Sequence, residues 1–262
     1  MEQRLDQYLV DHLLVTSRSK AQDAIQEGRV YVNEKVVSKN AYIVTEEDKV
    51  EVKKEDLCFA SRAGLKLYYA LMHFPISLKD RIVIDIGAST GGFSDVCLQK
   101  GAAYVYAVDV GHSQLIERLR CDERICNMEK TNCRFLEPAM FDKKPSFACI
   151  DVSFISLKLI LPGLLTILEG SYDIVALIKP QFEAGPQEVG KKGIIKNDKV
   201  HIRILQEMVD YVHSLGVYVH HLEVSKVLGR DGNKEFLMHI RKEPIQKVFL
   251  YKQIVQEKIN KR

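Results

Sequence analysis

Six nearly continuous apolar runs follow one another after residue 80, and they constrain the fold more than any other feature of the sequence. Stretches with helical periodicity separate them. Runs without alternation are typical of strands buried on both faces, as in parallel sheets covered by crossover helices. The last two runs alternate more and favour an antiparallel pair at the sheet edge. The runs are RIVIDIG (81–87), AYVYAVDVG (103–111), FACIDVSF (147–154), YDIVALIKP (172–180), VYVHHLEVS (217–225) and EFLMHIR (235–241).

Residues 1–55 have a different pattern, which predicts a separate small α+β domain. Leu5, Tyr8 and Leu9 share one face of a predicted helix, and a second amphipathic helix stops at Gly28. Alternation over 30–36 predicts a hairpin, and the alternation at 50–52 predicts a final strand. We interpret 56–61 as a linker and 62–262 as the larger domain.

Length and charge set limits on the class of protein. The chain has 262 residues, 46% of them hydrophobic, which is enough for one full α/β core and a small accessory domain. The net charge of +3 does not by itself indicate a nucleic-acid partner. Residues 1–60 carry 9 Lys/Arg against 12 Asp/Glu, so any RNA surface there must be a local face.

The cysteines and the N-terminus argue against several other classes. The six cysteines form no CxxC pair and have no histidine at ligand spacing, so we expect reduced thiols and no structural metal. Met1 leads into a polar segment without an apolar signal core, and no run reaches the roughly 20 apolar residues that span a bilayer. These features predict a cytoplasmic protein without membrane contact, and they leave its oligomeric state open.

The segment DIGASTGGF joins the first apolar run to a predicted helix and suits the close approach of a cofactor. It is not GxGxxG, because Ser89 takes the middle position, and it lacks the Gly-Lys-Ser/Thr of a P-loop. About 20 residues later, Asp109 ends the second run, where an acid accepts hydrogen bonds from ribose hydroxyls. Glu129 could face an adenine or cap a helix. The predicted cofactor-binding residues are Asp85, Gly87, Ala88, Ser89, Gly91, Gly92, Asp109 and Glu129.

Four charged residues lie beside or at the ends of apolar runs: Lys66, Asp151, Lys179 and Glu235. A ribose hydroxyl is a poor nucleophile until it loses its proton, and a lysine can take that proton if burial and a nearby cation lower its pKa. Lys179 is the better candidate, because it follows a strand at the crevice where doubly wound sheets bind ligands. For each lysine alone, a solvent-facing charge is the alternative interpretation.

These segments resemble the TlyA family, known both as haemolysins and as rRNA 2′-O-methyltransferases, whose catalytic domain is similar to the FtsJ/RrmJ methyltransferases. Matching blocks include RLDQYLV, SRAGLKL, DIGASTGGFSDV, DVSFISL and GNKEFLMHI, and they span essentially the whole chain. The resemblance implies an α/β, Rossmann-like S-adenosyl-L-methionine-dependent methyltransferase sheet with a small N-terminal α+β RNA-binding domain. It implies a cytidine ribose in 16S or 23S ribosomal RNA as the substrate, with ribosomal subunits as partners.

The resemblance also implies residue roles. The family's catalytic set falls on the four charged residues, with Lys179 as the base, Lys66 as its electrostatic partner, and Asp151 and Glu235 as orienting groups. Without the resemblance, the basic residues around the small domain would be ordinary surface charges. With it, the predicted RNA contacts are Arg4, Arg18, Lys20, Arg29 and Arg62.

Two other functions stay open at the level of sequence. One is a membrane-lytic haemolysin, which the family's name suggests. The other is a catalytically inactive assembly factor that binds S-adenosyl-L-methionine and RNA. The C-terminal stretch 241–262 has the pattern of a basic amphipathic helix that packs on the sheet.

Overall fold

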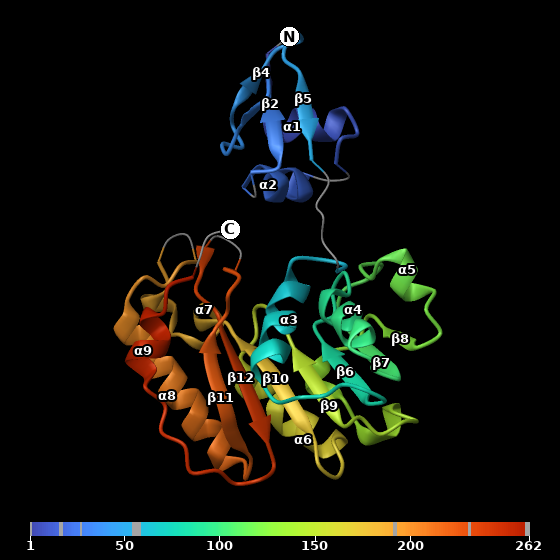
Figure 1. Ribbon diagram of the computed structural model, residues 1–262, viewed down its shortest axis with the longest axis vertical. Helices are drawn as coiled ribbons and strands as arrows, with labels where there is room; N and C mark the ends of the chain where they lie inside the picture. The colour runs from blue at the N-terminus through green and yellow to red at the C-terminus, as the bar shows by residue number, and fades with distance from the viewer. Residues whose placement is uncertain are drawn as a thin grey trace. The chain divides into compact units, whose positions relative to one another are not determined.

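The computed structural model describes residues 2–15, 18–26, 28–53, 59–190, 193–229 and 232–259. The chain divides into two compact units, residues 1–58 and 59–262 (Figure 1). The first unit has one buried apolar cluster, and the second has two, one on each face of its sheet. The predicted linker at 56–61 falls partly outside the described residues, because 54–58 are not described.

The N-terminal unit packs two helices, α1 (Leu5–Asp11) and α2 (Arg18–Gln26), on short strands. Strands β3 (Lys35–Val36), β2 (Val30–Val32) and β5 (Val50–Val52) form an antiparallel sheet in that order. Asn33 and Glu34 both have positive φ, 49° and 66°, as the two-residue turn of a tight hairpin requires. The structure adds a pair that the sequence pattern did not predict, β1 (Gln3–Arg4) with β4 (Ile43–Val44).

The second unit contains a seven-stranded sheet in the order β11-β12-β10-β9-β6-β7-β8. All of these strands run parallel except β12, which is antiparallel to both of its neighbours. The antiparallel pair was therefore predicted correctly, but only β11 forms the edge, since β12 lies between β11 and β10. The bounds are β6 Ile82–Ile86, β7 Tyr104–Val108, β8 Ile125–Met128, β9 Phe147–Ile150, β10 Asp173–Ile178, β11 Tyr218–Val224 and β12 Phe236–Arg241.

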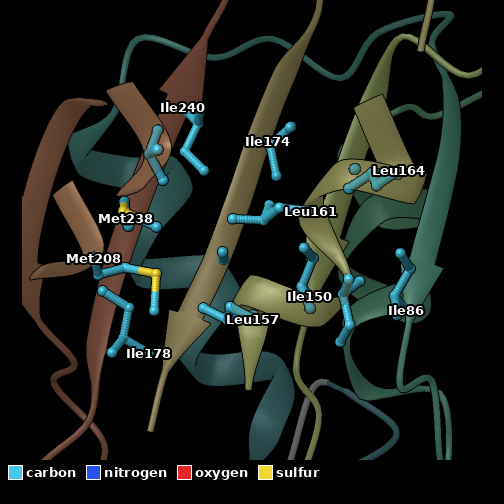
Figure 2. Packing of buried hydrophobic residues seen from close by; sticks show 14 of the residues in the cluster. Ile86, Ile150, Leu157, Leu161, Leu164, Ile174, Ile178, Met208, Met238 and Ile240 are labelled. Atoms are coloured by element: carbon cyan, nitrogen blue, oxygen red, sulfur yellow. The ribbon is translucent and has the colours of Figure 1, made fainter. Parts of the chain in front are cut away.

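Helices cover both faces of this sheet. On one face lie α3 (Ala63–His73), α4 (Gly92–Gln99) and α5 (Glu117–Arg120). On the other lie α6 (Leu161–Ile167), α8 (Asp198–Ser214) and α9 (Tyr251–Gln256), and Figure 2 shows Leu161 beside Ile174 and Met208 beside Met238. Among the described residues, the connections contain the short helix α7 (Pro180–Glu183) and the 3₁₀ turns η1 Cys133–Phe135, η2 Pro138–Met140, η3 Leu157–Leu159 and η4 Pro186–Glu188.

The pleat decides which residues face which helices. Val83, Cys149 and Leu237 belong to the α3/α4 cluster, whereas Ile84 and Met238 belong to the α6/α8 cluster. Side chains alternate along a strand, so residues two positions beyond a residue of the first set continue on the α3/α4 side. The charged residues predicted at the strand ends therefore project toward α3 and α4.

The C-terminal prediction was largely wrong. Within the described residues up to 259, the only helix after β12 is α9, six residues long, and 244–250 are irregular. Pro244 interrupts the helical pattern, and Val255 of α9 is buried in the α6/α8 cluster.

No helix in the described part of the chain is long and apolar enough to cross a membrane. The five cysteines that the structure describes are free, and none of the described His, Cys, Asp and Glu side chains form a group of three or more suited to a metal ion.

Candidate active site

The carboxyl edge of the sheet brings three of the charged residues together. Asp151 directly follows β9, and Lys179 directly follows its neighbour β10. Because β12 runs antiparallel, its first residue Phe236 pairs with Ile178, so Glu235, which directly precedes β12, lies at the same edge. All three continue the pleat toward α3, which contributes Lys66 as the fourth member.

The four side chains form two short ion pairs. Lys66 Nζ lies 2.6 Å from Glu235 Oε2, and Lys179 Nζ lies 2.5 Å from Asp151 Oδ1. All four side chains are at most 12% exposed, so these charges are largely removed from water. The structure thus places the four predicted catalytic residues in one cluster with equal numbers of basic and acidic groups.

The surrounding carboxylates hold Lys66 in its charged form. Burial lowers the pKa of Lys66, but the carboxylates of Asp151 and Glu235 outweigh burial and leave this pKa above its usual value. Lys66 therefore stays protonated and serves as a fixed positive charge. Arg62, which directly precedes α3, opposes this effect only weakly.

Lys179 has a second oxygen partner in the loop that follows β9. Its Nζ donates a hydrogen bond of 3.0 Å to Ser153 Oγ, in addition to its contact with Asp151. The next residue, Phe154, has φ of 64° and a side chain that is 90% exposed. Its ring lies 4.9 Å from the ring of Phe182 in α7.

The glycines of the turn meet a packing requirement within the protein as well as the one we predicted. We expected Gly87, Gly91 and Gly92 to make room for a ligand against the backbone, and this stays a prediction. In addition, a Cβ on Gly87 would lie 2.3 Å from the Asp151 carbonyl oxygen, and one on Gly91 would lie 2.3 Å from Leu119 Cδ1. A Cβ on Gly92 would lie 2.3 Å from Ser61 Oγ. These glycines are required by the packing around the turn, and Gly87 and Gly91 also by φ of 85° and 94°.

Asp85 lies within β6 and points at α4. Its Oδ2 accepts a 2.6 Å hydrogen bond from Ser94 Oγ, and its Oδ1 is buried without a hydrogen-bond partner. Complete burial raises the pKa of Asp85 to about 7. A carboxyl group that changes charge near neutral pH therefore lies directly before the turn.

An open cavity of about 1030 Å³ lies beside the turn. Gly87, Ser89, Asp109 and Asp151 line it, whereas Asp85, Ala88, Gly91, Gly92 and Glu129 do not. Sequence reasoning did not single out the other lining residues, most of which lie in the segments that follow β7, β8 and β9. These are Val108, Val110, Gln114, Thr131, Asn132, Cys133, Arg134, Val152, Ser153, Phe154, Ile155, Ser156, Leu159 and Phe182.

The two predicted acids beyond the turn hold backbone amides. Asp109 Oδ2 accepts a bond from the Ser89 amide at 2.8 Å, and its Oδ1 accepts one from Gly111 at 2.6 Å. Glu129 accepts bonds from the amides of residues 113–115, and these bonds, led by that of Leu115, lower its pKa to about 2. Glu129 organises this turn, and a contact with adenine stays a prediction.

In the N-terminal unit, two predicted RNA-binding residues share one buried acid. Arg4 Nε lies 3.0 Å from Asp6 Oδ1, and Arg18 Nη2 lies 3.1 Å from Asp6 Oδ2. Asp6 is fully buried, while the arginine side chains are 45% and 61% exposed. Arg29 donates to the Lys53 carbonyl at 3.4 Å, and Lys20 is exposed on α2.

Comparisons with known proteins agree with this architecture. Residues 59–242 match the FtsJ-like methyltransferase family, and residues 3–50 match the S4 domain. The fold and the family match define a methyltransferase of the Rossmann-like class whose cofactor is S-adenosyl-L-methionine. The chain belongs to the FtsJ-like methyltransferase family, and within it groups with the TlyA proteins.

Three relatives illustrate this grouping. YqxC of Bacillus subtilis, provisionally named an rRNA methyltransferase, is 50% identical over 91% of this chain and 85% of its own length. The 16S/23S rRNA (cytidine-2′-O)-methyltransferase TlyA of Mycobacterium tuberculosis is 36% identical over 91% of this chain and 89% of its own. A solved structure from Streptococcus thermophilus, provisionally named a hemolysin, has a TM-score of 0.78 at 42% identity and covers 97% of this chain and 94% of its own.

Proposed function

We propose that this protein transfers a methyl group from S-adenosyl-L-methionine to the 2′-hydroxyl of a cytidine ribose in ribosomal RNA. The observation that carries the proposal is the cluster of Lys66, Asp151, Lys179 and Glu235 at one edge of the sheet. The nucleotide specificity follows the name of the Mycobacterium tuberculosis relative. Ribosomal subunits in the cytoplasm would be the partners.

The cavity beside the turn suits the cofactor. Its lining combines amide and acidic groups at Ser89 and Asp109 with apolar side chains at Val110 and Leu159, as a nucleoside with an amino-acid tail requires. Asp109 would accept hydrogen bonds from the ribose, whereas Asp85 does not line the cavity and would support the turn from behind through its bond to Ser94. When bound, the cofactor supplies an activated methyl group on a sulfonium.

The chain's own residues would prepare the acceptor. Lys179 in its neutral form would accept the hydroxyl proton on Nζ as the 2′-oxygen takes the methyl group and the methyl–sulfur bond breaks to leave a neutral thioether, and Asp151 would orient Nζ. Lys66, kept positive by its carboxylate neighbours, stabilises the developing negative charge on the 2′-oxygen. Glu235 holds Lys66 in place. Exposed Phe154 at the cavity can stack on an unpaired base.

Charge-conserving variants test this division of labour. Lys179→Arg keeps the positive charge but cannot act as a base, because a guanidinium does not lose its proton in proteins. We expect it to lower single-turnover methyl transfer to ribosomal subunits by about 100-fold or more, in the range of general-base catalysis. Lys66→Arg keeps the fixed charge and should retain at least about a tenth of the rate.

The measurement is tritium incorporation from labelled S-adenosyl-L-methionine, with the modified nucleotide mapped by primer extension. Lys144→Arg, at an exposed surface pair with Glu169, is the matched control. Unchanged transfer by Lys179→Arg would contradict its role as the base. Wild-type protein that binds the cofactor by calorimetry but never labels RNA would support an assembly factor. Dye release from liposomes at low protein concentration would support the hemolysin name of the Streptococcus relative.

A further inference from the structure

Glu183 connects the two loops that carry Asp151 and Lys179. Its Oε2 accepts a 2.5 Å hydrogen bond from Ser156 Oγ, and its Oε1 accepts a 2.8 Å bond from the Leu157 amide. Glu183 lies in α7, which begins directly after Lys179, while Ser156 and Leu157 lie in the loop after β9. Burial raises the pKa of Glu183, against the opposing effect of these two bonds.

The two loops are therefore joined at both ends. At the near end, Lys179 Nζ contacts Asp151 and Ser153. At the far end, Glu183 contacts Ser156 and the amide of Leu157, whose side chain is buried.

Phe154 lies between these two sets of contacts, and its own conformation does not stabilise the loop after β9. Phe154 has a left-handed φ of 64°, which is unfavourable for an aromatic residue, and its side chain is mostly exposed. Such a conformation persists only where the surrounding contacts fix it. The contacts of Glu183, together with the contact between the rings of Phe154 and Phe182, fix this loop from the α7 side.

We propose that Glu183 is a positioning residue: it fixes the segment 151–157 so that Asp151 and Ser153 hold Lys179 Nζ in one place for proton transfer. This inference rests on the proposed methyl transfer. No contact between Glu183 and substrate is required. Misplacement of a catalytic group by about 1 Å can cost a factor of about 100 in rate.

Three variants separate this role from a general loss of stability. Glu183→Ala leaves the Leu157 amide and the Ser156 hydroxyl without their acceptor, so we expect single-turnover transfer to fall at least about tenfold. Glu183→Gln keeps one side-chain oxygen as acceptor and should restore the rate to within about threefold of wild type. Ser156→Ala removes one of the two bonds and should give an intermediate loss. Glu169→Ala, at an exposed surface pair, is the control and should be unchanged.

A second comparison tests whether Glu183 acts through the held lysine. Ser153→Ala removes one oxygen partner of Lys179, and we expect the double variant with Glu183→Ala to be no slower than Glu183→Ala alone. Fully additive losses would overturn the proposal.

Hydrogen exchange provides a readout that needs no activity. In Glu183→Ala, amides of 151–157 should exchange at least about tenfold faster, while those of β6 and β7 are unchanged. A slow enzyme with unchanged exchange in 151–157 would overturn the proposal, and so would faster exchange without loss of rate. If wild-type protein methylates no RNA, the proposed function fails. Hydrogen exchange still tests the role of Glu183 in that case, because unchanged exchange in Glu183→Ala would refute the proposal that Glu183 fixes the segment 151–157.

Discussion

At the scale of one residue, the buried carboxyl group of Asp85 makes the stability of the folded protein depend on pH. Its carboxyl group is completely buried, it has one hydroxyl partner in Ser94, and its other oxygen has no hydrogen-bond partner. The folded-state pKa of about 7 lies above the ordinary value of 3.8, so the folded protein binds a proton that the unfolded chain releases. The stability from this group is therefore fully present below about pH 3.8 and is lost as pH rises through 7.

Asp85→Asn should remove this pH dependence. We expect the variant to be more stable than wild type by about 2–4 kcal/mol at pH 8, with the difference shrinking toward pH 5, because the amide cannot ionise. Urea unfolding of the cofactor-free protein from pH 5 to 8 measures the difference. Asp210→Asn, at an exposed position of α8, is the control. A stability difference that does not change with pH would show that Asp85 ionises no differently in the folded state.

The sequence was informative about single residues where a strand ends. Asp151 and Lys179 follow apolar runs directly, so each had to lie at a sheet edge, and the pleat then placed both on one face. Glu183 and Arg134 could not be identified in this way. Their positions depend on how irregular loops fold back on one another, and no periodicity in the chain encodes that packing.

At the scale of elements, the contact between α3 and α4 positions both Lys66 and the glycine-rich turn. A Cβ on Gly64 of α3 would lie 2.8 Å from the Gly92 carbonyl oxygen of α4 and 2.9 Å from Phe59 Cβ. Backbone approach this close lets α3 lie near the sheet edge, where Lys66 reaches Glu235. The helix was predictable from its pattern, but this approach depends on two glycines far apart in sequence.

Gly64→Ala should therefore push the two helices apart. We expect a loss of about 1–3 kcal/mol in the free energy of unfolding, as for other overpacked sites, together with weaker cofactor binding. Gly163 in α6 is a matched control, because an added Cβ there meets nothing within 4 Å. Gly163→Ala should leave stability unchanged or raise it by up to about 1 kcal/mol. Calorimetric unfolding of both variants measures the contrast, and equal effects at the two glycines would contradict this account of the α3–α4 contact.

At the scale of the whole molecule, the order of the strands along the chain was easier to predict than the order in which they lie side by side in the sheet. Six apolar runs predicted a mostly parallel sheet, yet the insertion of β12 between β10 and β11 depends on long-range pairing that no local pattern records. That insertion matters for function, since it brings Glu235 to the edge that holds Lys179. The N-terminal unit is expected to bind RNA, although its overall composition is acidic.

We expect the N-terminal unit to bind RNA through Arg4 and Arg18, the two arginines that pair with Asp6. Arg18 is 61% exposed but anchored by a fully buried carboxylate, so it can contact a phosphate without first losing side-chain freedom. In the full chain, Arg18→Ala should weaken binding to ribosomal RNA and lower the slope of log affinity against log salt by about 1. Calorimetric affinity for S-adenosyl-L-methionine should not change. Lys35→Ala, an equal charge loss on exposed β3, is the control, and an identical slope change there would show that net charge, rather than the anchored pair, governs RNA binding.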